Sequence, residues 1–328
     1  MLARNALTRQ HSLSIRRVAL SATPIRFRHS SVAATQHGGP VGNPSHRVYF
    51  SRDNVPISPW HDIPLLANSS TREYNMVCEI PRWSNAKLEI DTTTPFNPIK
   101  QDSKNNRPRY VADIFPYKGY IWNYGAFPQT FEDPNHTDKD TGCVGDSDPV
   151  DVIEVGQAIS AEGSVHRVKV LGLVALIDDG ETDWKVLAIR SDDPMADRIQ
   201  DIKSLETYMP GLVGATVDWF SKYKVPDGKP LNSWAFDGRA KDADYAHSVI
   251  AATHDAWSRL IHSDKEAGFA LTNTTVRSSP HYLSTDIASQ EFKALTGGSS
   301  AQVPGDSTKV PVKWHYVHEG MVANCSKE

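Results

Sequence analysis

The sequence predicts an α+β protein with a mainly β core. Patterns typical of strands come first along the chain and helical patterns follow, an order that favours α+β over a wound parallel sheet. The predicted strands are also short and separated by loops, which favours a small closed barrel with the helices packed outside it. At 39% hydrophobic and 23% charged residues, the composition is that of a globular protein with a core.

The first half of the chain is predicted to be rich in strands. They are expected over residues 47–51, 76–80, 86–90 and 109–115. The second and third look like a hairpin whose polar face carries Glu79, Lys87 and Glu89, although a solvated face of a half-buried sheet would show the same pattern.

A glycine-punctuated aromatic segment follows at residues 117–125. Its tyrosines, including Tyr120 and Tyr124, either line a pocket with phenol hydroxyls or pack a core beneath a turn. Residues 128–142 are predicted to form a polar loop that leads to an acidic segment.

This acidic segment, residues 145–151, reads Gly-Asp-Ser-Asp-Pro-Val-Asp and precedes an apolar run. In an extended chain Asp146 and Asp148 point to one side and Asp151 to the other. Pro149 favours a bend that would bring all three carboxylates together. Since Mg²⁺ prefers oxygen ligands, the segment is either a metal site or a solvated acidic turn, and alone it does not decide between them.

The second half begins with a buried strand over 168–177, an acidic turn over 178–183 and a return strand over 184–189. The turn lacks the ligand spacing and flanking helices of an EF-hand.

Helices are then expected from Asp193-Pro194 through Leu205, over 212–223 and over 242–262. Residues 264–311 are predicted to be a loop-rich surface excursion, and 312–317 a strand or strap that returns to the body.

The N-terminus differs from the rest of the chain. Residues 1–52 contain no Asp or Glu, and six arginines fall within the first thirty, a composition typical of an organelle transit peptide. We therefore expect a mitochondrial transit peptide over about 1–35 and a single domain over 36–328, with a disordered cytosolic tail as the alternative to the transit peptide. Removing residues 1–30 would change the formal net charge from −4 to −10, which disfavours nucleic-acid binding.

Two further classes are disfavoured. No apolar stretch approaches the roughly 18 residues of a membrane helix, so no membrane span is expected. The cysteines, Cys78, Cys143 and Cys325, form neither a metal-ligand pattern nor a disulfide framework, which fits a reducing compartment.

Polar side chains from these segments form a candidate site. They are the carboxylates Glu79, Glu89, Asp146, Asp148, Asp151, Asp178 and Asp183, the cations Lys87, Arg109, Lys185 and Lys224, and the phenols Tyr120, Tyr124 and Tyr223. Two like charges 4 Å apart repel by about 4 kcal/mol at an effective dielectric of 20, so divalent metals are expected among the carboxylates. The cations and phenols suit phosphate oxygens. The set therefore predicts a site for a small polyphosphate.

With these residues in place, the chain resembles the soluble family I inorganic pyrophosphatases in their longer eukaryotic form, over roughly residues 40–318. The Asp-Ser-Asp-Pro-Val-Asp run matches the family's specific D-x-D-P-x-D signature. Segments 79–83, 87–89, 119–125, 178–185 and 223–224 match further family motifs in order. Together with the N-terminus, the chain is similar to a fungal mitochondrial form, which implies the mitochondrial matrix.

The resemblance implies hydrolysis of pyrophosphate to two orthophosphates by metal-activated water, with several Mg²⁺ ions per site and Mn²⁺ as a substitute. By analogy Asp146, Asp151 and Asp183 hold the tightest metal, and Asp148 takes the proton of the attacking water. The other implied metal ligands are Glu79, Glu89 and Asp178. The implied substrate-binding residues are Lys87, Arg109, Tyr124, Lys185, Tyr223 and Lys224, with Tyr120 as a proton donor.

The resemblance also implies a five-stranded OB-like closed barrel with helices outside and additional flanking strands. Family members of this form are typically homodimers, for which Arg82, Trp83 and Trp314 are candidate interface residues. Two other functions are a scaffold subunit with little catalysis and an OB-type nucleic-acid binder. The first would be supported by lost carboxylates, and none is lost; the second needs a basic groove with stacking aromatics.

Overall fold

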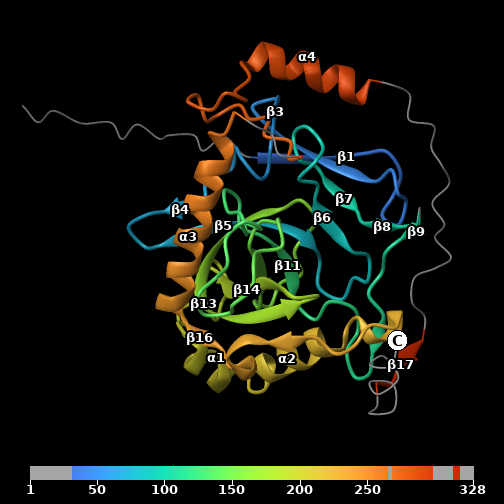
Figure 1. The fold of residues 1–328 in the computed structure, drawn as a ribbon, viewed down its shortest axis with the longest axis vertical. Coiled ribbons are helices and arrows are strands. Elements are labelled where there is room, and N and C mark those ends of the chain that lie inside the picture. The colour runs from blue at the N-terminus through green and yellow to red at the C-terminus, as the bar shows by residue number, and fades with distance from the viewer. Residues whose placement is uncertain (1–31, 106, 265–267, 298–312, 318–328) are drawn as a thin grey trace, which may run out of the picture. The chain divides into compact units, whose positions relative to one another are not determined.

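Strands dominate the chain in the computed structural model, which describes residues 32–105, 107–264, 268–297 and 313–317 (Figure 1). The first eleven strands are β1 Val32–His37, β2 Arg47–Arg52, β3 Val55–Ile57, β4 Leu66–Asn68, β5 Glu73–Ile80, β6 Leu88–Ile90, β7 Ile99–Gln101, β8 Ser103–Lys104, β9 Arg107–Pro108, β10 Asp113–Ile114 and β11 Asn123–Ala126. The others are β12 Asp151–Glu154, β13 Val165–Asp178, β14 Glu181–Arg190, β15 Ser233–Trp234, β16 Lys241–Asp242 and β17 Trp314–His315. The predicted mainly β fold with few helices is confirmed.

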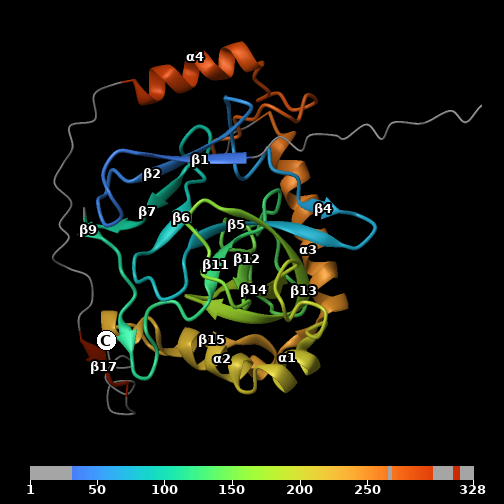
Figure 2. The same ribbon diagram turned by 180° about the vertical axis from the view of Figure 1, so that it is seen from behind.

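The larger sheet runs in the order β15-β13-β14-β12-β11-β5-β4, with β16 beside β13. Strand β5 pairs with β13 as well as with β11, so β5, β11, β12, β14 and β13 each pair with two others of this set. The pair β12–β14 is parallel and the others are antiparallel. Figure 2 shows β11, β12 and β14 between β5 and β13. The apolar run in β13 is buried along most of its length, as the sequence predicts.

The smaller sheet has the order β1-β2-β7-β6, with β3 paired to β2. It overturns the predicted hairpin of residues 76–80 and 86–90. Strand β5 belongs to the larger sheet, whereas β6 pairs with β7. The two segments nevertheless meet, because the backbone N–H of Ile90 donates a 2.8 Å hydrogen bond to Oε1 of Glu79. The predicted strand over 109–115 is reduced to β10, which pairs in parallel with β17.

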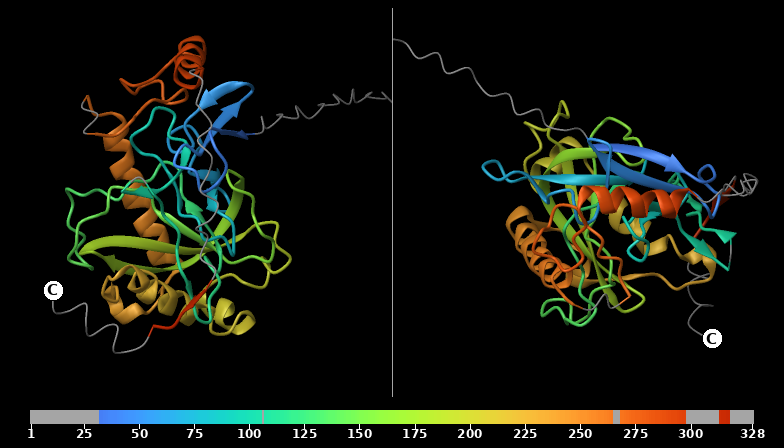
Figure 3. Two further views of the ribbon diagram at one scale, coloured as in Figure 1. Left: turned by 90° about the vertical axis from the view of Figure 1, so that its right-hand side faces the viewer. Right: turned by 90° about the horizontal axis from the view of Figure 1, so that it is seen from above.

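Four α-helices and two 3₁₀ turns complete the described residues. They are α1 Ile202–Tyr208, α2 Leu212–Lys222, η1 Val225–Asp227, η2 Ala235–Gly238, α3 Ala243–Ile261 and α4 Thr285–Thr296. Helix α3 packs its buried face on the larger sheet near β13, as predicted, and Figures 1 and 3 show α4 on the opposite side of the β structure from α1 and α2. Among the described residues, none of the helices has the length and hydropathy that crossing a bilayer would require.

Two helix predictions are wrong. Helix α1 begins at Ile202, capped by Asp201, and not at Asp193-Pro194, because the Asp193 carboxylate accepts hydrogen bonds from Met195 N and Gln157 N and closes a turn. The stretch 264–311 is predicted to be loop-rich, and the helix α4 within it is missed; this helix lies at the surface and packs through Ala288 against Tyr49 and Phe96.

Candidate active site

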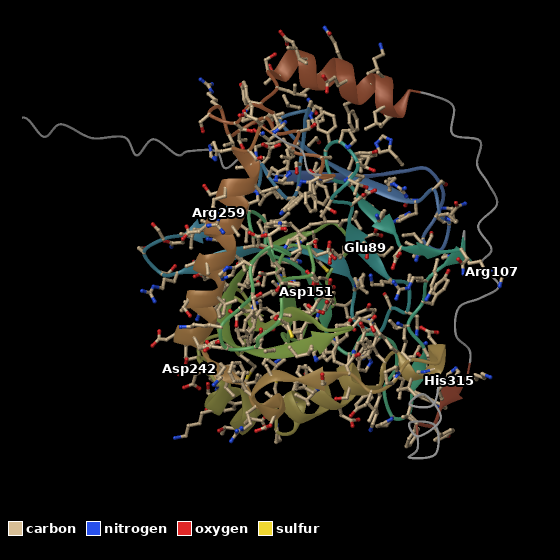
Figure 4. All side chains as sticks on the ribbon, in the orientation of Figure 1. Glu89, Arg107, Asp151, Asp242, Arg259 and His315 are labelled. Carbon is tan, nitrogen blue, oxygen red and sulfur yellow. The ribbon has the colours of Figure 1, made fainter. Side chains whose placement is uncertain are left out.

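All of the sequence-predicted site residues line one cavity of about 340 Å³, named here the inner cavity. Its walls come from β5, β6, the 145–151 segment, the β13–β14 turn and the end of α2. In Figure 4 Glu89 and Asp151 lie near the centre of the view, away from Arg259 and Asp242 on the α3 side. Segments from across half the chain therefore meet at this cavity.

The acidic segment is folded into a tight turn at one end of the inner cavity. Ser147 has a φ of 77°, and the backbone N–H of Asp148 donates a 3.0 Å hydrogen bond to Oδ1 of Asp146. At Gly145 a Cβ would lie 2.3 Å from the carbonyl carbon of Glu132, so only glycine allows this approach. The three carboxylates face one cavity, as predicted, and the turn at Ser147 contributes to this beside Pro149.

Glu132 is a residue that the sequence interpretation missed. Its carboxylate lies with those of Asp146 and Asp183 so that one oxygen of each falls within 4.8 Å of the others. Burial, followed by the charges of Asp146 and Asp183, raises the pKa of Glu132 well above its ordinary value. An all-oxygen set of carboxylates, two of them buried and Asp146 partly buried, whose charges disfavour one another fits a hard divalent cation.

The carboxylate of Asp151 is held differently. It accepts hydrogen bonds from the Tyr124 hydroxyl and from Nζ of Lys185, which also donates to Asp183. The Lys185 side chain is only 3% exposed. The described structure therefore places Asp151 beside a buried cation, and groups Asp146 and Asp183 with Glu132.

The opposite wall carries paired cations. Lys87 donates to Glu89 and, at 3.1 Å, to Asp102, and Arg109 donates to Asp102 at 2.6 Å. Asp102 is a second residue that the sequence interpretation missed. Although burial opposes it, the charges of Lys87 and Arg109 lower the pKa of this carboxyl. Asp102 thus holds both cations side by side where they face the cavity.

Tyr223 and Lys224 share a third carboxylate. The Tyr223 hydroxyl donates a 2.9 Å hydrogen bond to Asp178, and Nζ of Lys224 also donates to Asp178. These residues follow α2, whereas Asp178 ends β13, so the contact joins a helix end to the acidic turn.

Three remaining residues have raised pKa values, and two of them, Glu79 and Tyr120, are buried. Asp148 is exposed at the surface of the cavity, but desolvation by its neighbours, then the charge of Asp146, raises its pKa well above the ordinary value, and Lys87 opposes the shift. Burial and the charge of Asp151 do the same for Glu79. Burial also raises the pKa of Tyr120, whose ring lies 5.3 Å from that of Tyr124, so this phenol is a weaker acid than an exposed tyrosine. The aromatic segment thus does both predicted jobs, since Tyr120 and Tyr124 line the cavity and Trp122 is buried in the core.

Neither missed residue carries a strong sequence signal. Glu132 lies beside Asp133 in a polar loop without a distinctive spacing. Its position depends on hydrogen bonds from Glu132 N to Asp148 O and from Ser147 N to Glu132 O, both 2.9 Å. Asp102 lies between the short strands β7 and β8. Both are brought to the site by contacts between distant segments.

Comparison with known proteins identifies the family. The model of the family described as inorganic pyrophosphatase matches residues 76–258. An inorganic pyrophosphatase of Drosophila melanogaster is 49% identical over 287 residues, covering 87% of this chain and 84% of its own. The inorganic pyrophosphatase structure from Schistosoma japonicum superimposes with a TM-score of 0.77 at 40% identity, covering 87% of this chain and all of its own.

A truncated Trypanosoma cruzi vacuolar soluble pyrophosphatase, solved in complex with PPi, superimposes with a TM-score of 0.67 at 36% identity and covers 79% of this chain and 99% of its own. The matched region contains Glu79 through Lys224, and hence every predicted site residue. The chain belongs to the inorganic pyrophosphatase family.

Proposed function

We propose that the inner cavity is where this inorganic pyrophosphatase hydrolyses pyrophosphate, with Mg²⁺ as its divalent metal. As a member of the family, the chain is a diphosphatase that converts pyrophosphate to two orthophosphates. One observation carries the assignment of the site: the inner cavity is lined both by a group of carboxylates and by the cations Lys87, Arg109 and Lys224. Such a cavity suits metal ions on one side and phosphate oxygens on the other.

The residues present fit a divalent cation. Asp146 and Asp183 are the ligands favoured both by the resemblance and by their grouping, and Glu132 and Asp151 compete for the third position. Mg²⁺ and Mn²⁺ both accept such oxygen sets, so Mn²⁺ is expected to substitute. A bound divalent ion lowers the pKa of water and neutralises phosphate charge.

The protein's own side chains then have separate tasks. Asp148 accepts the proton of the attacking water, since desolvation and the charge of Asp146 raise its pKa and make its carboxylate a stronger base than an isolated aspartate. Arg109 and Lys87 hold phosphate oxygens, positioned by Asp102. Tyr223 and Lys224 hold the other end of the substrate, and Glu79, Glu89 and Asp178 are available for further metals. The buried Tyr120 hydroxyl is placed for hydrogen bonding to substrate more than for donating a proton.

The function is tested by measuring phosphate release from pyrophosphate by the purified full-length chain. We expect turnover with Mg²⁺, weaker turnover with Mn²⁺, and none with EDTA. Hydrolysis that is unaffected by EDTA would contradict the metal requirement.

The competition between Glu132 and Asp151 can be resolved by metal titration. Replacing a direct ligand should weaken the tightest metal site more than the roughly 10–100-fold loss expected from a supporting residue. The variants Glu132→Gln and Asp151→Asn are each titrated with Mn²⁺, and the electron paramagnetic resonance signal of free Mn²⁺ gives the dissociation constant of each. The variant with the larger loss of affinity identifies the direct ligand. Equal, small losses in both would contradict each as a ligand.

We also propose that the paired strands β5, β11, β12, β14 and β13 form the five-stranded closed barrel of OB type implied by the resemblance. The double pairing of β5 supports this, because a sheet closes when its two edge strands pair with each other. The helices and the smaller sheet are then the flanking elements.

A homodimer is proposed from exposed aromatic rings. Trp83 is 55% exposed, Phe115 53% and Trp314 44%, and large aromatic side chains are enriched at protein interfaces. Arg82 lies over the Trp83 ring, 5.9 Å from its centroid. Sedimentation of Trp83→Ala/Trp314→Ala should show dissociation to monomers at concentrations where the parent protein is dimeric.

Import into the mitochondrial matrix remains a proposal from composition alone, since residues 1–31 lie outside the described residues. A fusion of residues 1–40 to a fluorescent protein should enter mitochondria. A diffuse cytosolic signal would refute import.

A further inference from the structure

A larger cavity of about 1210 Å³ adjoins the inner one and is named here the outer cavity. The two cavities share Lys87, Arg109, Asp179, Tyr223 and Lys224 in their linings. Arg109 and Lys224 thus stand at the boundary between them. A ligand in the outer cavity would approach the substrate-binding side of the inner cavity and not its carboxylate end.

The outer cavity is basic where the inner one is acidic. The charged residues that line only the outer cavity are Lys104, Arg107, Lys229, Lys313 and a single acid, Asp227. The inner cavity, by contrast, is lined by more carboxylates than cations. In the absence of metal, a phosphate-bearing anion is therefore attracted to the outer cavity and repelled from the acidic end of the inner one.

Two of these cations are held opposite each other. Lys104 and Arg107 are direct partners in the β8–β9 pair, so their side chains lie on the same face. Within the described part of the chain, neither side chain forms an ion pair with a carboxylate. Like charges directly opposite each other on paired strands are unfavourable, and an anion between them would relieve the repulsion.

The C-terminal strap supplies another wall. Strand β17 pairs with β10, and Phe115 N donates a 2.9 Å hydrogen bond to His315 O. Alternation along the strap directs Lys313 and His315 to the outer cavity, while the ring of Trp314 packs 5.8 Å from that of Phe115. Figure 4 shows Arg107 and His315 on the same side of the view. The strap and the β8–β9 turn thus bound one basic space from two directions.

We propose that the outer cavity is a second anion site, which binds a chain of three or more phosphates without metal. Its cations extend from Arg107 and Lys104 through Lys229 to Arg109 and Lys224, which suits an extended polyanion better than a single phosphate. The chemistry is that of the triphosphate group, whether free or attached to a nucleoside. This inference rests on the charges of the outer cavity and is independent of the proposed function.

The direct test is calorimetric titration of the metal-free full-length protein, in EDTA at low ionic strength, with sodium triphosphate. We expect saturable binding that weakens as salt is added. The variant Lys104→Ala/Arg107→Ala/Lys229→Ala should weaken binding roughly tenfold or more, since it removes three favourable charge contacts. The charge-conserving Lys104→Arg/Arg107→Lys/Lys229→Arg should retain most of it.

A matched control removes three exposed cations that line neither cavity: Lys139→Ala/Arg198→Ala/Lys203→Ala. The control should bind triphosphate within about twofold of the parent, as expected for distant, screened charges. If triphosphate binding were weakened equally in the control and test variants, the effect would depend only on net charge, and the proposed site would be wrong. Absence of triphosphate binding by the parent protein would also overturn it.

Two further measurements complete the test. The first asks whether a nucleoside triphosphate binds like free triphosphate, and the second tests the proposed function separately from the outer cavity. ATP should bind with the same sensitivity to the test variant, whereas adenosine should not bind; adenosine binding of equal strength would overturn recognition through the phosphate chain. Hydrolysis of pyrophosphate with Mg²⁺ is measured in parallel, and kcat of the test variant should stay within about twofold of the parent, because exposed charges mainly affect encounter. If the parent protein did not hydrolyse pyrophosphate at all, the proposed function would be contradicted, but the triphosphate-binding result would still stand.

Discussion

The two groups of charged residues at the inner cavity, named here the cationic wall and the acidic wall, differ in how their charges are compensated. On the cationic wall, Lys87 and Arg109 share Asp102, and Lys224 has Asp178, so these charges are already paired within the protein. On the acidic wall, Glu132 and Asp146 face each other and Asp183. The cations are each paired with a carboxylate, whereas on the acidic wall Lys185 contacts Asp151 and Asp183 but not Glu132 or Asp146, so protons or a metal would stabilise that wall further. The difference explains why the family needs a divalent cation, and it can be tested one residue at a time.

The largest effect is expected from Asp148→Asn, which removes the proposed base from the acidic wall without changing its size. Turnover with Mg²⁺ should fall by roughly a thousandfold, within the range that general bases contribute. Phosphate release measures it, with Asp255→Asn on the exposed face of α3 as the control. Wild-type turnover in Asp148→Asn would rule out the role assigned to this residue.

Glu132→Gln should give opposite signs with and without metal. Gln can still accept the hydrogen bond from Trp184 N, but it removes one of the mutually repelling carboxylates. We expect the metal-free variant to be more stable than the parent by about 1 kcal/mol, and its Mg²⁺ affinity to fall roughly 10–100-fold. Thermal unfolding with EDTA and with Mg²⁺ measures both changes. If the variant were less stable than the parent under both conditions, the repulsion assigned to the metal-free acidic wall would be contradicted.

Asp102→Asn examines the cationic wall. Loss of its negative charge weakens two charge-assisted hydrogen bonds, so Lys87 and Arg109 become less well positioned for phosphate. We expect KM for pyrophosphate to rise about tenfold with a smaller change in kcat, because a loss near 1.4 kcal/mol is tenfold in affinity. An unchanged KM would mean that the cations need no such partner.

The last prediction concerns the pH dependence of stability, which involves no substitution. Burial raises the native pKa of Glu132 and Asp183 above the unfolded values near 4, so the native state retains protons that the unfolded state releases. This contribution to stability is present below about pH 4 and is lost as pH rises through the raised native pKa.

The metal-free protein should therefore become less stable as pH rises above about 4, and Mg²⁺ should flatten this dependence because it replaces the protons. Urea unfolding at several pH values gives the free energy of unfolding with and without Mg²⁺. The difference between the two curves reports the carboxylates of the acidic wall, because histidines elsewhere contribute equally to both. If the stabilisation by Mg²⁺ did not vary with pH, the metal-free carboxylates would not be holding extra protons in the native state.

Much of the site could be predicted because its residues lie in short, distinctive runs. Three carboxylates within residues 146–151 and two tyrosines in 120–124 carry their chemistry in local spacing. Glu132 and Asp102 could not be found this way, because each reaches the site through contacts with segments distant in the chain.

The fold shows the same division between local and distant information. The apolar run of β13 and the amphipathic α3 were predictable from periodicity alone. The β5–β6 hairpin was wrong because alternation predicts a strand but not its partner, and β5 takes partners far along the chain. The start of α1 was wrong because Asp193 has the side chain of a helix cap but closes a turn.

The pairing of β5 with β13 also has a kinetic consequence. Val77 is the partner of Val165, so the pairing must close a long loop, and it cannot form until the second half of the chain is available. Folding dominated by such distant pairings takes milliseconds to seconds rather than microseconds. During synthesis the edge of β5 that β13 covers therefore stays unpaired until residues 165–168 have been made.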